Sequence, residues 1–273
     1  MHPIDEVMTE SKACFSHPKC YASKLNNCSP KITREHFVSH GILRAIGASG
    51  PLLTKGLRWQ PASKEQFIPT NGLASNILCE NHNSQLSDLD NEAIRLFTFL
   101  QNFQKGDKAT LPKEAEIEID GSLIERWLLK TTCGFLASNN SPTYQPEIHS
   151  RWKPEHWWID ILFGRTPMPE PFGLHFFGGV PPQTPTNDYS SGLQYQPFME
   201  HGLGVYGAIF SLYTPRFLLS MAFPPKKLVG TFLEHATRHP ANLILSDEHL
   251  IHKVSFRWSP NETGRPINIM IRR

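Results

Sequence analysis

Two pairs of soft metal ligands lie in the first third of the chain. Cys14 and Cys20 belong to the stretch CFSHPKC, and Cys79 and His82 stand three positions apart in LCENHN. Tetrahedral zinc takes four sulfur or nitrogen ligands, which are commonly delivered as two close pairs. A small segment with few apolar residues would gain much of its folding free energy from such an ion. The spacing therefore predicts one structural zinc site.

The choice of ligands in the first pair stays open at this level. Cys28 and His17 lie in the same polar segment, and either could replace one of the four ligands on spacing alone. The chain has 5 cysteines, and residues 1–12 are acidic and polar rather than arranged as a signal peptide. We therefore expect reduced thiols and a cytoplasmic protein, in which clustered cysteines favour zinc over disulfides.

The order of these residues resembles the HNH-type (ββα-metal) nuclease domain. The resemblance rests on the pattern Cys…Cys…Glu-His…Cys-x-x-His-Asn and extends from Cys14 to about Leu100. In that family two strands and a helix surround one catalytic divalent ion, and a structural zinc often holds the strands to the helix. The resemblance thus implies the same arrangement for this part of the chain.

The resemblance also implies a role for each matching residue. Glu35 and Asn83 match the ligands of the catalytic ion, and His36 matches the general base that activates water. Asn76 matches the asparagine that holds the intervening loop in that family. The set that matches the structural zinc ligands is Cys14, Cys20, Cys79 and His82.

The implied division of labour agrees with the chemistry of these side chains. A neutral imidazole has a pKa near neutrality and can accept a proton from an attacking water molecule. Carboxylate and amide oxygens suit Mg²⁺ or Mn²⁺, whereas thiolates suit zinc. The sequence therefore offers two chemically distinct metal environments.

Local patterns predict the elements that position these residues. A helix is expected where apolar residues recur at helical spacing, at Leu86, Leu89, Ala93, Leu96, Phe97 and Leu100. Residues 42–46 predict another short helix, and EIEID at 116–120 alternates like a strand. Ser122 and Glu125 predict a capping box for the helix that follows this strand.

The second half of the chain has a β-rich pattern. Strands are expected in GVYGAIFSLY, RFLLSMAF, ANLILSD, HKVSFRW and INIMIR, and a helix is expected over 226–239. We therefore predict an α+β chain of two domains. Residues 1–105 would form the zinc-stabilised ββα-metal domain, and residues 106–273 would form a β-rich α+β domain of unassigned fold, with a recognition or regulatory role.

Composition limits the function classes without selecting one. The net charge of +2 over 273 residues does not by itself indicate a nucleic-acid-binding protein. A metal-dependent nuclease needs no strongly basic chain, because the ion supplies positive charge at the phosphate. The chain contains no apolar run of about 18 residues, so no transmembrane helix is expected.

Some candidate residues also have purely structural explanations. Asn83 could be a helix N-cap, and Glu35 with His36 could lie at a solvated helix start. Asp88 and Asp90 could be solvated, could anchor a loop, or could orient His36 from outside the metal site. The pair Trp157 and Trp158 could stack on bases or fill a core.

The function that these residues predict is metal-dependent hydrolysis of phosphodiester bonds in DNA, or less readily RNA. Zinc would be structural, Mg²⁺ or Mn²⁺ catalytic, and nucleic acid the partner, with a possible protein partner or ligand for residues 106–273. The alternative is a catalytically inactive zinc-organised module that binds nucleic acid or protein. A near-neutral charge and Gln85, where the HNH family often has a basic residue, favour this alternative.

Overall fold

The fold is mixed α+β, and it is known from a computed structural model. The structure describes residues 15–45, 51–54, 57, 60, 66–105, 110–139, 152–177, 193–200, 204–212, 216–221, 236–259 and 263–270. None of the helices in these ranges combines the length and the apolar character that a bilayer crossing requires.

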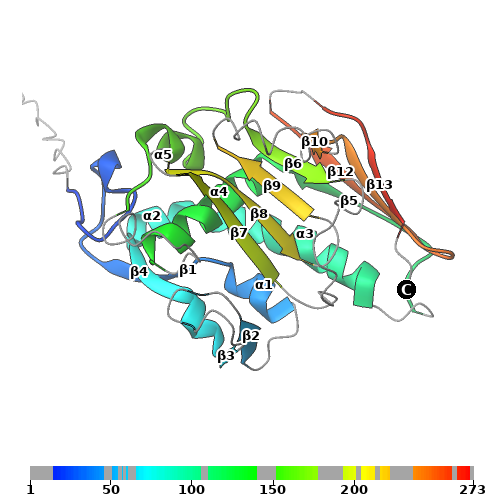
Figure 1. The fold of residues 1–273 in the computed structure, drawn as a ribbon, viewed down its shortest axis with the longest axis horizontal. Helices are drawn as coiled ribbons and strands as arrows, with labels where there is room; N and C mark the ends of the chain where they lie inside the picture. The colour runs from blue at the N-terminus through cyan, green and yellow to red at the C-terminus, as the bar shows by residue number, and fades with distance from the viewer. Residues whose placement is uncertain are drawn as a thin grey trace, which may run out of the picture.

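The N-terminal part contains two small antiparallel ladders and three helices (Figure 1). Strand β1 (Ile32–His36) pairs with β4 (Ala74–Cys79), and β2 (Leu52–Thr54) pairs with β3 (Gln66–Ile68). Helix α2 follows β4 directly, so β1, β4 and α2 occur in the order strand, strand, helix. The helices of this part are α1 (His40–Ala45), α2 (Glu80–Gln85) and α3 (Ser87–Lys105), and short 3₁₀ turns cover Ser23–Leu25 and Thr70–Leu73.

Two larger sheets contain the remaining strands. One has the order β10-β6-β9-β8-β7 and is antiparallel throughout, and the other has the order β13-β11-β12-β5 with parallel pairs at both ends. Their strands are β5 (Glu114–Asp120), β6 (Gly173–Phe177), β7 (Leu193–Glu200), β8 (Gly204–Leu212), β9 (Arg216–Ser220), β10 (Ala236–Arg238), β11 (Asn242–Ser246), β12 (Ile251–Arg257) and β13 (Ile267–Met270). The strands expected in the second half are thus confirmed.

The helix expected over 226–239 is not found in the residues of this range that the structure describes. Residues 236–238, expected at the end of a helix over 226–239, form β10 and pair with β6. Pairing with the edge of a sheet overrides a helical apolar spacing, because the ladder satisfies the backbone groups of both strands. Residues 226–235 lie outside the described residues.

Helix α4 (Gly121–Ala137) begins differently from the prediction. The cap is Asp120, whose Oδ1 accepts a hydrogen bond from the backbone N–H of Leu123 at 3.2 Å. The expected capping box of Ser122 and Glu125 is wrong, because β5 runs directly into the helix and Glu125 is buried elsewhere.

Helix α4 connects the N-terminal part to the five-stranded sheet (Figure 1). The ring of Trp127 lies 5.2 Å from that of Phe97 in α3 and 5.0 Å from that of Phe210 in β8. On the other side, a Cβ atom at Gly134 would lie only 2.7 Å from the Cβ of Phe37, just after β1. Helix α4 thus packs on elements from both predicted domains. The domain boundary between residues 105 and 106 stays a prediction.

We predict that Gly134→Ala destabilises the protein by about 1–3 kcal/mol, because the added methyl group collides with Phe37 and cannot be accommodated without a backbone shift. Chemical denaturation would measure the loss. The control is Gly72→Ala, where the nearest atom is the flexible end of Ile68 at 3.3 Å and where we expect a change of less than about 0.5 kcal/mol. A stabilised Gly134→Ala variant would show that α4 can move away from β1.

Candidate metal centre

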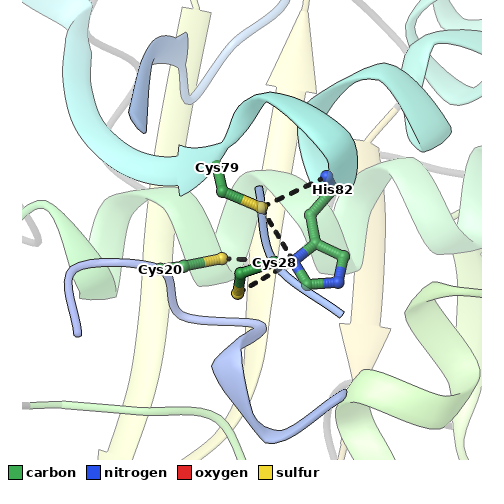
Figure 2. A group of neighbouring side chains, drawn as sticks. All are labelled: Cys20, Cys28, Cys79 and His82. Carbon is green, nitrogen blue, oxygen red and sulfur yellow. Dashed lines mark hydrogen bonds between the residues drawn. The ribbon is translucent and has the colours of Figure 1, made fainter. Parts of the chain in front are cut away.

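Three cysteines and a histidine meet in a buried cluster (Figure 2). The Sγ atoms of Cys20, Cys28 and Cys79 lie 3.3, 3.7 and 3.2 Å from the Nδ1 atom of His82. All four ligand atoms lie within 4.8 Å of one another. Tetrahedral zinc would place a sulfur and a nitrogen ligand about 3.6 Å apart. The cluster could therefore hold a structural metal ion such as zinc.

Three of the four predicted zinc ligands belong to this cluster, namely Cys20, Cys79 and His82. The fourth position is taken by Cys28, one of the two alternatives that spacing left open. Cys14 lies outside the described residues. The other alternative, His17, accepts a hydrogen bond from the backbone N–H of Lys19 at its Nδ1 atom and is not a member of the cluster.

The chain returns to the cluster through two local structures. After Cys20 the backbone makes the 3₁₀ turn at Ser23–Leu25 and then forms a bridge between Phe15 and Asn27. The N–H of Cys28 donates to the carbonyl of Phe15 at 2.8 Å. This reversal brings Cys28 beside Cys20, and no periodic pattern in the sequence indicates it.

Backbone N–H groups point at the sulfur atoms. Cys79 ends β4 and caps α2, and its Sγ accepts from the N–H of His82 at 3.5 Å. Burial opposes ionisation of Cys79, but the N–H groups of His82 and Ser29 outweigh it and lower the pKa of this thiol. Burial raises the pKa of the Cys20 thiol, and the N–H groups of Cys79 and Ala22 only partly offset this effect. A bound cation would supply the remaining stabilisation of the thiolates.

Asn27 sets the orientation and tautomer of the histidine ligand. The Nε2 and Oδ1 atoms of His82 and Asn27 lie 2.6 Å apart. Nε2–H therefore donates to the amide oxygen, and the lone pair of Nδ1 faces the three sulfur atoms. Burial, and then the charge of Arg165, lower the pKa of His82, which keeps the ring neutral as a metal ligand must be. Sequence analysis missed Asn27, whose only signal is its place before Cys28.

The loop that carries Cys20 and Cys28 is also held by the segment before and after α5 (His156–Leu162). Lys24 Nζ donates to the carbonyl oxygen of Pro154 at 3.0 Å, and Lys153 Nζ donates to Ser23 Oγ at 3.1 Å. The ring of Phe163 meets that of His82 edge-on at 5.3 Å. The cluster thus connects parts of the chain that are far apart in sequence.

Glu35 and Asn83, predicted to hold a catalytic ion, do lie together. The Asn83 side chain hydrogen-bonds to Glu35, and its Nδ2 donates to Thr33 Oγ1 at 3.1 Å. A third side chain has not been anticipated: Lys130 of α4, whose Nζ lies 2.5 Å from Glu35 Oε1 and 2.6 Å from Asp90 Oδ2. Its signal in the sequence is the one lysine of this helix, which follows the apolar run of residues 127–129.

His36 points away from this group. Successive residues of a strand face opposite sides of a sheet, so Glu35 faces α4 while His36 faces His40, with ring centroids 5.0 Å apart. Burial, followed by the charges of His40 and Arg34, lowers the pKa of His36, and a hydrogen bond with Asn71 opposes this shift. The ring is therefore neutral near pH 7. In the described residues no hydrogen bond or ion pair joins His36 to Glu35.

The remaining candidate residues can also be placed. Asp90 binds Lys130 and Ser39, so it anchors the segment between β1 and α1 and does not orient His36, whereas Asp88 is exposed, as the solvated alternative expected. Asn76 is exposed in β4 opposite Arg34, and the asparagine whose side chain bonds to His36 is Asn71. Of the tryptophan pair, Trp158 is buried and Trp157 is partly exposed.

The two metals implied by the HNH resemblance fit this structure differently. The Cys3His cluster, with its N–H donors and its oriented imidazole, suits a structural zinc ion. Glu35 does not suit a catalytic Mg²⁺ or Mn²⁺ ion, because a buried ammonium group already neutralises it.

Comparison with protein-family models finds no matching family, and no curated protein or solved structure matches the chain. The resemblance to HNH nucleases thus rests on the residues and their spacing.

We predict that the purified protein contains about one zinc ion per chain, as a tetrahedral site requires. Cys28→Ser should lose this zinc and lower the melting temperature, because metal binding and folding are coupled. Cys133→Ser is the matched control, since Cys133 is also a buried free cysteine but lies in α4 outside the cluster. Metal analysis and thermal unfolding would measure both effects. Full zinc content in Cys28→Ser, or a folded wild type without metal, would contradict the assignment.

Proposed function

We propose that the zinc-organised N-terminal unit binds nucleic acid through its phosphate groups and does not cut it. Support comes from one surface feature, here called the cationic patch, which consists of Arg34, His36, His40 and Arg44. The exposed side of β1 and helix α1 together form this patch.

Secondary structure brings the four side chains together. Arg34 and His36 share one side of β1 because they are two positions apart, and His40 and Arg44 share one face of α1 because they are four positions apart. The contact between the His36 and His40 rings joins the two pairs. Arg34, His40 and Arg44 are exposed, and His36 is half-buried.

The arginines of the patch are available to a ligand. The Arg34 guanidinium donates to the carbonyl oxygen of Asn71 at 2.7 Å, which orients it without neutralising it. Among the described residues, no ion pair uses Arg34 or Arg44. Guanidinium groups bind phosphate oxygens in a planar, bidentate manner, and such contacts provide affinity that does not depend on sequence. Nucleic acid is thus the partner that this patch fits best.

We expect Arg44→Glu to weaken binding of a fluorescein-labelled DNA duplex about 10-fold at low salt and to reduce the salt dependence of the affinity by about one phosphate contact. Fluorescence anisotropy over a series of salt concentrations would measure both. Lys113→Glu, a charge reversal at an exposed lysine just before β5, is the matched control and should bind nearly as well as wild type. An equal loss in both variants would show that net charge rather than the patch is responsible, and absence of wild-type binding to DNA and RNA would refute the proposal.

Hydrolysis of phosphodiester bonds is the second candidate, and His36 favours it. A neutral imidazole near Arg34 could accept a proton from water next to a bound phosphate, if ligand binding brings water to its buried Nε2 atom, which has no hydrogen-bond partner among the described residues. The Lys130 contact to Glu35 argues against the metal-dependent form of this reaction. The endonuclease activity implied by the HNH resemblance therefore ranks behind binding alone.

A plasmid-nicking assay in Mg²⁺ or Mn²⁺ separates the two candidates. We expect wild type and His36→Ala to give the same background, because the binding module performs no general base catalysis. The control histidine is the exposed His249 in His249→Ala. If wild type nicks DNA and only His36→Ala loses about 100- to 10,000-fold in rate, hydrolysis with His36 as base is the correct function.

A further inference from the structure

Glu35 and Asp90 share a single buried cation, the ammonium group of Lys130. The side chain of Lys130 is 2% exposed and that of Glu35 is 8% exposed, so this ion pair is shielded from water. Asp90 is 25% exposed on its side chain and also accepts a hydrogen bond from Ser39 Oγ. Asp90 is therefore the member of the group that water reaches most readily.

Lys130 has no alternative position for its charge. It lies in the middle of α4, where the neighbouring residues Leu128, Leu129, Thr131 and Thr132 are also buried. A lysine near a helix end can extend its stem to bring the ammonium into water, but the surroundings of Lys130 prevent this. Burial acts to lower the pKa of Lys130, and the charges of Glu35 and Asp90 outweigh it and raise that pKa. The group therefore remains a cation across the neutral range.

The position of this cation corresponds to that of the catalytic ion in the HNH resemblance. Glu35 comes from the end of the first strand, and Asn83, hydrogen-bonded to it, comes from the helix that follows the second strand. These are the two residues that the resemblance assigns to a divalent ion. In this chain the carboxylate that would coordinate the ion instead contacts Lys130 Nζ.

We infer that Lys130 is the resident cation of the Glu35–Asp90 site. The native chain therefore binds no divalent ion at this site. A neutral residue at position 130 would open the site to Ca²⁺ or Mn²⁺. Nζ lies 2.5 and 2.6 Å from one oxygen of each carboxylate, so without the ammonium group both carboxylates would face the same position and could serve as oxygen ligands of a hard divalent cation there. Water entering beside Asp90 would complete the coordination. The inference goes beyond the proposed nucleic-acid binding and does not depend on it.

The test compares zinc-loaded wild type, Glu35→Gln, Lys130→Met and the double variant Lys130→Met/Glu35→Gln. Bound Mn²⁺ is counted by electron paramagnetic resonance, and melting temperatures are measured with and without Ca²⁺. We expect Lys130→Met to melt roughly 6–20 °C lower, since it leaves two carboxylates without their partner. Ca²⁺ at about 100 times its Kd should restore roughly 5–10 °C of that loss. The double variant, which lacks the Glu35 carboxylate, should be less destabilised than Lys130→Met and should gain nothing from Ca²⁺.

The wild-type measurement decides the inference even if Lys130→Met does not fold. Wild type should bind zinc alone, with no Mn²⁺ signal that disappears in Glu35→Gln and no change of melting temperature in Ca²⁺. A Mn²⁺ ion held by wild type and lost in Glu35→Gln would overturn the inference, and so would a folded Lys130→Met that ignores Ca²⁺ and Mn²⁺. The experiment contains no nucleic acid, so a failure of the cationic patch to bind DNA would leave these results unchanged and would refute only the proposed function.

Discussion

Helix α4 is buried along almost its whole length, so a polar side chain on it is stable only where it finds a partner inside the protein, and several of its polar residues do. Glu125 accepts a hydrogen bond from the N–H of Leu174 at 2.7 Å and pairs with His239 Nε2 at 2.8 Å. Trp127 Nε1 donates to Ser39 Oγ at 2.7 Å. The two contacts of Glu125 hold β6 and the residue after β10. The hydrogen bond of Trp127 holds the segment between β1 and α1. One helix thereby sets the position of both halves of the chain.

The Cys3His cluster and the Lys130 group act on opposite ends of the same small ladder. Cys79 ends β4, while Glu35 lies near the end of β1, so a metal ion would hold one end of the β1–β4 pair and an ammonium group holds the other. Each of these interactions requires all of its partners to be present, because a buried charge or an unliganded thiolate without its partner is destabilising.

Strand alternation separates the structural side of β1 from its outward side. Glu35 faces α4 and is neutralised there, whereas Arg34 and His36 lie on the opposite side of β1 and belong to the cationic patch. The adjacent residues Glu35 and His36 consequently have different surroundings. A strand held on one side by Glu35 can present its other side to a ligand, which suits binding. The expected role of residues 106–273 in recognition or regulation stays a prediction. Their five-stranded sheet contacts the N-terminal part through Phe210 and Phe217, whose rings meet Phe97 of α3.

Features that depend on neighbours along the chain could be read from the sequence. Ligand type and close spacing identified Cys79 with His82, apolar periodicity identified α3, and strand-like patterns identified β8, β9, β11, β12 and β13. The sequence did not indicate β6 or β7, and β10 was expected to be helical. Long-range contacts in the folded chain make Cys28 complete the cluster, make Asp120 the cap of α4 and place Lys130 against Glu35. A chain reversal and a contact between a strand and a distant helix leave no periodic pattern in sequence. Burial then determines which charge must be satisfied, because only the folded protein removes Glu35 and Lys130 from water.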